Sequence, residues 1–191
     1  MIAYDSFRGK IRYFIYIIKC IMLTGKEIFN SGMLIGADPG AVQQQGVDIR
    51  IDKVSKIRGM GIIPKEGKTS LPEYDEVKPL HFKNKESGKM VFGWMLPAGV
   101  YDIVFIEGVK VDSTHCMKPL TRSSLVRCGA RVDSGLYDAG FETAHAGAML
   151  YVSNPIMIER GARVAQIVCG ASDEVENLYD GQFQGDKQRR S

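Results

Sequence analysis

The sequence predicts a mainly β domain, in which short strands form a sandwich or a barrel. Short segments of strand-like composition follow one another between residues 90 and 169, and turn residues separate them. No long amphipathic helix pattern occurs after residue 32. The 21 glycines and 7 prolines among 191 residues fit a fold with many turns. This length allows one ordinary domain with its own core.

The first expected element is a short helix. Thr24 and Glu27 have the spacing of a capping box, which predicts a helix from Gly25 to about Ser31. Residues 36–46 have the composition of a loop. The alternation of apolar and polar side chains over Val47–Ile51 then predicts a half-buried strand.

Strand and turn signals alternate along the rest of the chain. Residues 64–90 are polar and rich in Lys, Glu and Pro, so we expect a long surface excursion there. Turns are expected at Pro97–Gly99 and Ser153–Pro155. The strands predicted around them are Met90–Met95, Gly99–Glu107, Ser124–Val132, Ala148–Val152 and Arg163–Cys169.

We divide the chain into an extension over residues 1–21, a domain over 22–185 and a basic tail over 186–191. The apolar run Ile11–Leu23 is too short to span a bilayer and is interrupted by a lysine. No signal-peptide cleavage site follows it. Two interpretations of residues 1–21 remain open: a surface-packed helix or strand, or translation from a start codon upstream of Met22.

The charge distribution argues against a nucleic-acid partner. Of the formal net charge of +3, residues 1–21 carry +3 and residues 186–191 carry +2, which leaves −2 for the domain between them. The domain therefore offers no basic platform for a polyanion, and any phosphate site must be local. We expect neither a nucleic-acid polymer nor a membrane as a partner.

The cysteines and glycines exclude several classes of site. No pair among Cys20, Cys116, Cys128 and Cys169 has C-x-x-C spacing, and the zinc-deaminase pattern is absent, so we expect no zinc site. Few cysteines without a spacing pattern are typical of proteins in a reducing cytoplasm. We expect each of these cysteines to be a small, buried hydrophobic residue. No glycine-rich loop joins a strand to a helix, which excludes a P-loop or Rossmann site.

The segment from residue 121 to 127 suits polyphosphate oxygens. It holds two cations, Arg122 and Arg127, and two hydroxyls, Ser123 and Ser124. Arginine binds such oxygens through two N–H groups, and serine adds a neutral hydrogen bond. The alternative is a solvated turn that leads into a strand.

The segment from residue 136 to 141 carries one carboxylate, Asp138, among apolar and small residues. This carboxylate can act as a general base on water, or contact metal-bound water. Gly140 allows close backbone approach, and Phe141 can lie against a sugar or a base. The alternative is an ordinary Asx turn. Farther along, Gly161–Ile167 has the pattern of a hairpin turn that enters a strand.

Together, these segments resemble the dUTPase and dCTP deaminase superfamily in order and spacing, over about residues 22–185. The family has a G-x-D strand motif, an R-S-S-L segment, an I-D-x-G-[FYW] motif, a G-x-x-[IV]-x-Q-[IL] motif and an aromatic, glycine-rich tail. The matching residues are Met22–Ile28 at the start, Gly46-Val47-Asp48, Arg122-Ser123-Ser124-Leu125 with Arg127, Tyr137–Phe141, Gly161–Ile167 and Tyr179–Gly185.

The resemblance implies a distorted β-barrel or jelly roll of the dUTPase type and a homotrimer whose active sites are shared between subunits. It implies a deoxyribonucleoside triphosphate bound with Mg²⁺, which the phosphates and water hold rather than protein ligands. The implied phosphate-binding residues are Arg122, Ser123, Ser124, Arg127 and Gln166. Nucleoside-binding residues are Tyr137, Gly140, Phe141, Tyr179, Gln182, Phe183 and Gln184, with the base read mainly by backbone groups.

The absence of a glutamate that the deaminase branch uses decides which reaction we predict. The deaminase branch moves protons with a Glu ten residues after its motif Asp, and here that place is Ala148, or Tyr151 if the strand-ending Asn154 is aligned. Leu136 also replaces an arginine usual in that branch, and Gln182 replaces a common lysine. Hydrolysis needs only a carboxylate to orient water and cations to neutralise pyrophosphate. We therefore predict a dUTP diphosphatase, with Asp138 as the base that directs water at the α-phosphorus.

Two alternatives stay open. One is a dCTP deaminase, alone or combined with dUTPase activity, that uses Glu142 or His145 as its base. The other is a non-enzymatic trimer that senses nucleotides. For the remaining residues, we expect Asp48 to pair with an arginine, and His81 and His115 to lie at the surface. The tail from Tyr179 to Gly185 is expected to be mobile without ligand and to close over it.

Overall fold

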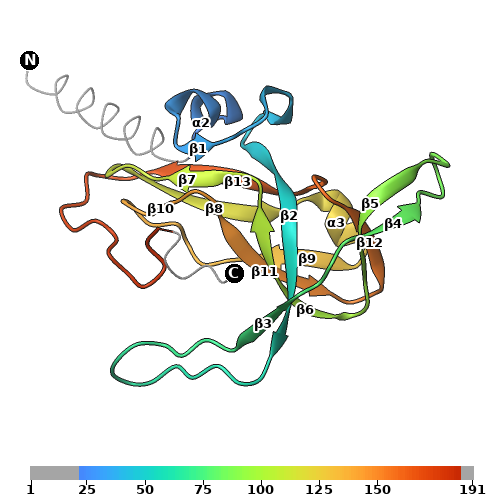
Figure 1. Cartoon of the computed structure of the whole chain (residues 1–191). Helices are drawn as coiled ribbons and strands as arrows, with labels where there is room; N and C mark the ends of the chain where they lie inside the picture. The colour runs from blue at the N-terminus through green and yellow to red at the C-terminus, as the bar shows by residue number, and fades with distance from the viewer. Residues whose placement is uncertain (1–21, 186–191) are drawn as a thin grey trace, which may run out of the picture.

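The structure is a computed structural model that describes residues 22–185. The predicted extension and basic tail, residues 1–21 and 186–191, lie outside the described residues. Antiparallel strands dominate the described part, as the sequence predicts (Figure 1). Among these residues, no helix is long and apolar enough to cross a membrane.

The elements follow one another closely. The helical segments are α2 (Gly25–Ser31), the 3₁₀ turn η1 (Pro39–Ala41) and α3 (Ser123–Arg127). The strands are β1 (Leu34–Ile35), β2 (Val47–Arg58), β3 (Glu73–Glu76), β4 (Leu80–Lys83), β5 (Met90–Leu96), β6 (Gly99–Phe105), β7 (Gly108–Lys110), β8 (His115–Thr121), β9 (Ala130–Asp133), β10 (Glu142–Thr143), β11 (Gly147–Val152), β12 (Ile156–Glu159) and β13 (Arg163–Ala171).

Three sheets enclose the core. The largest has the order β8-β13-β2-β6-β11-β9, with β3 added beside β2, and the smaller ones have the orders β1-β7-β10 and β12-β5-β4. Strand β2 pairs with β13 through its first half and with β6 and β3 beyond it, and its register shifts between Ile51 and Lys53. Such an irregularity bends a strand. The bend lets β2 pass from one wall of the barrel-like sheet to the next.

The predicted first helix is confirmed. Thr24 Oγ1 accepts from the Glu27 N–H at 3.3 Å, and the Glu27 carboxylate accepts from the Thr24 N–H at 2.8 Å. Hydrogen bonds from the Thr24 N–H and the Thr24 hydroxyl to the Glu27 carboxylate hold the pKa of Glu27 below its usual value. Buried Ile28 faces the core, and Gly32 ends the helix with a φ of 73°.

The predicted strand over Ser124–Val132 is wrong. Residues 123–127 form the single-turn helix α3, and strand β9 begins only at Ala130. Gly129 lies between them with a φ of +80°, which is a left-handed conformation that glycine adopts without strain. The surface excursion predicted over residues 64–90 is largely exposed, and it contains the short strands β3 and β4.

Candidate active site

The end of β8 and helix α3 position the predicted phosphate-binding segment. Arg122 has an extended backbone at the N-cap of α3, and Leu125 is buried, which anchors the turn against the core. This anchoring leaves the hydroxyls of Ser123 and Ser124 and the guanidinium of Arg127 on the exposed side of the helix. The local fold thus presents hydroxyl donors and a cation together to solvent.

Behind α3, Arg122 pairs with the buried carboxylate of Asp48 on β2. The Arg122 Nε to Asp48 Oδ1 distance is 3.3 Å, which agrees with the predicted pairing of Asp48 with an arginine. Asp48 is only 1% exposed, and its Oδ2 has no hydrogen-bond partner among residues 22–185. Burial raises the pKa of Asp48 above its usual value, although the charges of Arg122 and Arg163 oppose this shift.

Gln166 on β13 joins the same cluster. It lies opposite Asp48 in the pairing of β13 with β2, and its side chain passes over Gly46. A Cβ added at Gly46 would lie 2.7 Å from Gln166 Cγ and 2.4 Å from the carbonyl oxygen of Ile167, so only glycine fits there. Three segments that are distant in sequence therefore meet around Asp48.

Sequence reasoning missed Arg163, the first residue of β13. Its backbone carbonyl accepts a hydrogen bond from Arg122 at 3.1 Å, and its Nη2 lies 3.1 Å from Asp38 Oδ2. Hydrogen bonding to the Gly40 N–H, with a further contribution from Arg163, holds the pKa of Asp38 below its usual value. The only sequence signal for Arg163 is its place inside the Gly161–Ile167 motif.

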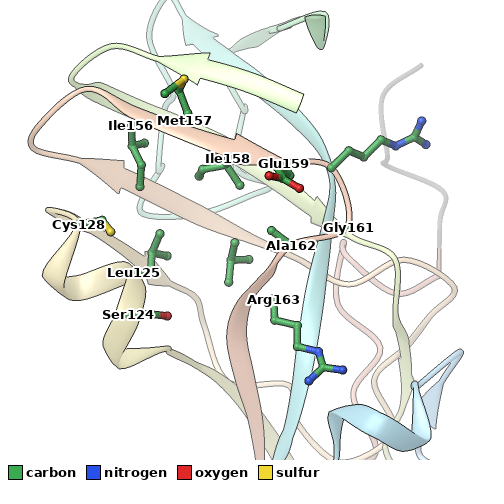
Figure 2. A pocket seen from close by; sticks show the side chains of 12 residues that line it. Ser124, Leu125, Cys128, Ile156, Met157, Ile158, Glu159, Gly161, Ala162 and Arg163 are labelled. Atoms are coloured by element: carbon green, nitrogen blue, oxygen red, sulfur yellow. The ribbon is translucent and has the colours of Figure 1, made fainter. Parts of the chain in front are cut away.

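A pocket of about 380 Å³ lies between α3 and the turn from β12 to β13 (Figure 2). Ser124 lies on one side of it, with Arg160 and Arg163 among its other polar linings. The remaining lining is mainly apolar, from residues that include Leu125, Ile156, Met157, Ile158, Ala162 and Val164. The pocket thus combines a hydroxyl and cations with an apolar wall, beside the phosphate-binding segment.

The predicted Asp138 segment forms a turn, which we call the 137–142 turn. Tyr137 bridges to Met117 on β8, and its hydroxyl donates to the Gly147 carbonyl at 2.7 Å. The Phe141 N–H donates to the Asp138 carbonyl at 3.0 Å and closes the turn. The Asp138 side chain belongs to an exposed residue, and its carboxylate is therefore accessible to a bound molecule.

The tail lies against this turn. The Tyr179 ring meets Phe141 edge-on, with ring centroids 5.4 Å apart, and Phe141 stacks on Tyr137 at 5.3 Å. Gln184 makes two hydrogen bonds to backbone groups of the turn. Gln182 is half-buried, and Phe183 is 47% exposed. The structure thus brings together the Asp138 segment and the tail.

The phosphate-binding segment and the 137–142 turn lie apart within one chain. Strand β8 contacts Tyr137 at Met117 and reaches Arg122 only after its last residue, Thr121. Four residues of strand from Met117 to Thr121 span about 13 Å at roughly 3.3 Å per residue. Figure 1 shows α3 and β10 on opposite sides of the molecule. The predicted site residues therefore form two separate groups.

The structure places both positions aligned with the deaminase glutamate. Ala148 is buried and pairs with Ile103 of β6, while Tyr151 is half-buried, with the Arg131 guanidinium 4.7 Å from its ring centroid. Neither residue carries a carboxylate. Of the alternative bases, Glu142 lies 3.4 Å from Lys110 Nζ on exposed side chains, and His145 is exposed.

The other histidines and the cysteines differ in how deeply they are buried. His81 is exposed, as predicted, whereas His115 is half-buried, with its Nδ1 2.7 Å from Asp112 Oδ1. Cys169 is buried, and burial raises the pKa of its thiol to about 12. Cys116 is half-buried, whereas Cys128 is exposed and corrects the prediction of a buried residue. Cys20 lies outside the described residues.

Within residues 22–185, no group of three or more His, Cys, Asp or Glu side chains could hold a metal ion. A divalent cation in this protein would therefore take most of its oxygen ligands from a bound molecule and from water, a mode that Mg²⁺ commonly uses with phosphates.

Comparisons with known proteins cover most of the described domain. Residues 24–170 match the family model described as dCTP deaminase-like. A deoxyuridine 5'-triphosphate nucleotidohydrolase of Methanocaldococcus jannaschii is 34% identical over 145 residues, which cover 75% of this chain and 87% of the relative. A probable deoxyuridine 5'-triphosphate nucleotidohydrolase of Aeropyrum pernix is 30% identical over 87% of this chain and 99% of its own length.

A solved structure supports the fold. The 2'-deoxycytidine 5'-triphosphate deaminase from Agrobacterium tumefaciens superposes on 80% of this chain with a TM-score of 0.55 and 19% sequence identity. This chain covers 49% of that protein, about half its length. The likeness confirms the predicted β architecture.

Proposed function

This chain belongs to the dCTP deaminase-like family, as its motifs predict, and we propose that within this family it acts as a dUTP diphosphatase. The proposal is that it hydrolyses dUTP to dUMP and pyrophosphate. The observation that carries it is the exposed Asp138 in a chain whose two candidate deamination positions are Ala148 and Tyr151. The naming of archaeal relatives as deoxyuridine triphosphate nucleotidohydrolases supports the same substrate.

The proposed chemistry needs one proton acceptor and several charge-neutralising groups. Asp138 orients a water molecule and takes its proton while the water oxygen attacks the α-phosphorus. The bond from the α-phosphorus to the bridging oxygen breaks, and pyrophosphate leaves. Arg122, Arg127, the two serine hydroxyls and the Gln166 amide donate hydrogen bonds to the phosphate oxygens.

Magnesium is proposed to bind with the substrate. Phosphate oxygens and water would supply its ligands, and the cation would neutralise charge on the departing pyrophosphate. The remaining proposed contacts serve the nucleoside: the rings of Tyr137 and Phe141, the backbone at Gly140, and Tyr179, Gln182 and Phe183 of the tail.

We further propose that the active site is completed between subunits of a homotrimer. The 137–142 turn contacts β8 at Met117, whereas Arg122 follows its last residue, Thr121, so the two groups of site residues lie apart. A base must come within hydrogen-bond reach of the water that it activates. A second copy that places its 137–142 turn beside α3 of the first would join them. A trimer provides three such junctions by one repeated contact.

The proposed reaction is tested by products. Purified protein is incubated with dUTP or with dCTP, each with Mg²⁺, and the products are separated by chromatography. We expect dUMP and pyrophosphate from dUTP. Release of ammonia from dCTP at a comparable rate would favour the deaminase instead, and binding of either nucleotide without turnover would favour the nucleotide sensor.

The shared site is tested by mixing inactive variants. Asp138→Asn removes the base and Ser124→Ala removes a phosphate contact, so each homotrimer should be weakly active. Mixed trimers, formed by dissociation and reassembly, should regain a fraction of wild-type turnover, because some of their sites combine two intact halves. Light scattering should give a trimer mass at micromolar concentration. A monomer mass, or no recovery in verified mixed trimers, would contradict a shared site.

A further inference from the structure

Gln184 of the tail holds two backbone groups of the 137–142 turn through its side-chain amide. Its Nε2 donates to the Gly140 carbonyl at 2.9 Å, and its Oε1 accepts from the Glu142 N–H at 3.2 Å. The other edge of this segment is already paired, since the Gly140 N–H donates to Val111. Strand β10 also ends its sheet among the described residues. The amide therefore occupies an otherwise uncovered donor and acceptor.

A pyrimidine base presents the same pattern of groups. In a primary amide, one N–H lies beside the carbonyl oxygen. Uracil offers N3–H beside a carbonyl oxygen in the same relation, and cytosine offers its amino N–H beside the N3 acceptor. The Gly140 carbonyl and the Glu142 N–H can pair with any of these edges. Because the Glu142 N–H has one hydrogen to donate, Gln184 and a base compete for it.

The rest of the tail fixes Gln184 in this position. The Tyr179 N–H donates to the Ala139 carbonyl at 2.8 Å, and the Gly185 N–H donates to the Glu142 carbonyl at 2.8 Å. Leu178 fills the space beside Gly140, where an added Cβ would lie 2.6 Å from the Leu178 Cβ. The glutamine is thus anchored on both sides in sequence.

We propose that Gln184 occupies the place of a pyrimidine edge on the turn, and that a nucleotide must displace it to bind. This inference rests on the proposed function, which places the nucleoside on this turn. It replaces the predicted role of Gln184 as a nucleoside contact with that of a competitor. The apparent affinity for nucleotide is then lowered by the fraction of molecules in which the glutamine holds the turn.

Calorimetric titration of the full-length protein with dUMP and with dCMP tests this inference. These probes carry a base and one phosphate, so contacts to a polyphosphate do not mask the effect. Gln184→Ala should bind at least one of them about fivefold or more tightly than wild type, because two hydrogen bonds no longer compete. Gln184→Leu should also tighten binding, since its apolar side chain can neither donate to the Gly140 carbonyl nor accept from the Glu142 N–H. Exposed Gln45→Ala, a matched control, should bind as wild type does.

Weaker or unchanged binding of both probes by both folded Gln184 variants would overturn the inference, and weaker binding would indicate a contact to the nucleotide instead. The same preparations are assayed with dUTP to separate this result from the proposed function. If the wild-type protein releases dUMP from dUTP but the Gln184 variants bind neither probe more tightly, only the proposed competition between Gln184 and the base is overturned. Wild type that neither hydrolyses dUTP nor binds either probe overturns both proposals.

Discussion

Replacing Asp138 with Asn is expected to lower dUTP turnover at least about a hundredfold, the range over which a positioned general base accelerates a reaction. Asparagine keeps the size and much of the hydrogen bonding of aspartate, but it cannot take a proton from water. The residue is exposed on a turn closed by backbone hydrogen bonds, so the change should not disturb folding. Steady-state kinetics and nucleotide titration measure the two effects separately.

Asp133→Asn is the matched control for that substitution, because Asp133 is an exposed carboxylate five positions earlier, on β9. It should keep wild-type turnover. Asp138→Asn with near wild-type turnover would contradict the proposed role of Asp138, whatever base the enzyme then used. Loss of nucleotide binding together with turnover would instead assign Asp138 to binding.

Deleting residues 178–191 is expected to abolish turnover while leaving the domain folded and assembled. The deletion removes Tyr179, which packs on Phe141, and Phe183, which is exposed and available to cover a bound base. Folding should survive, because residues 172–178 are exposed and residues 179–185, the described part of the deleted segment after residue 178, add no strand to a sheet. Activity and light scattering on the truncated protein check both parts.

A shorter deletion, of residues 186–191, separates the lid from the basic end of the chain. It keeps the hydrogen bonds of Gln184 and Gly185 to the turn, so turnover should remain. Unchanged turnover after the longer deletion would refute a lid role for the tail. The Gln184 variants differ from both deletions, because they release the turn but keep the aromatic residues.

Local signals predicted the elements that local interactions determine. The capping box of Thr24 and Glu27 appears in the structure because its hydrogen bonds join residues three apart. The strand prediction that began at Ser124 was wrong because α3 has only five residues. A helix this short cannot be distinguished from a strand by its pattern of apolar residues. Strand β8 was missed because Pro119 interrupts it, which is tolerated since β8 ends its sheet.

In the candidate site too, local motifs could be recognised in the sequence, whereas contacts between distant residues could not. Motif order predicts Asp138 and the Arg122 segment as site residues, since both motifs consist of residues adjacent in the chain. Arg163 was missed because its partner Asp38 is 125 positions away. The hydrogen bonds of Gln184 to the turn span 42 and 44 positions, and no spacing rule in the sequence predicts such a contact.

Turnover of dUTP in ¹⁸O-labelled water tests the central claim most directly. If water activated by Asp138 attacks the α-phosphorus, mass spectrometry should find one labelled oxygen in dUMP and none in pyrophosphate. Label in pyrophosphate and none in dUMP would place the attack on the β-phosphorus and contradict the account. Release of ammonia from dCTP without formation of dUMP from dUTP would contradict hydrolysis itself.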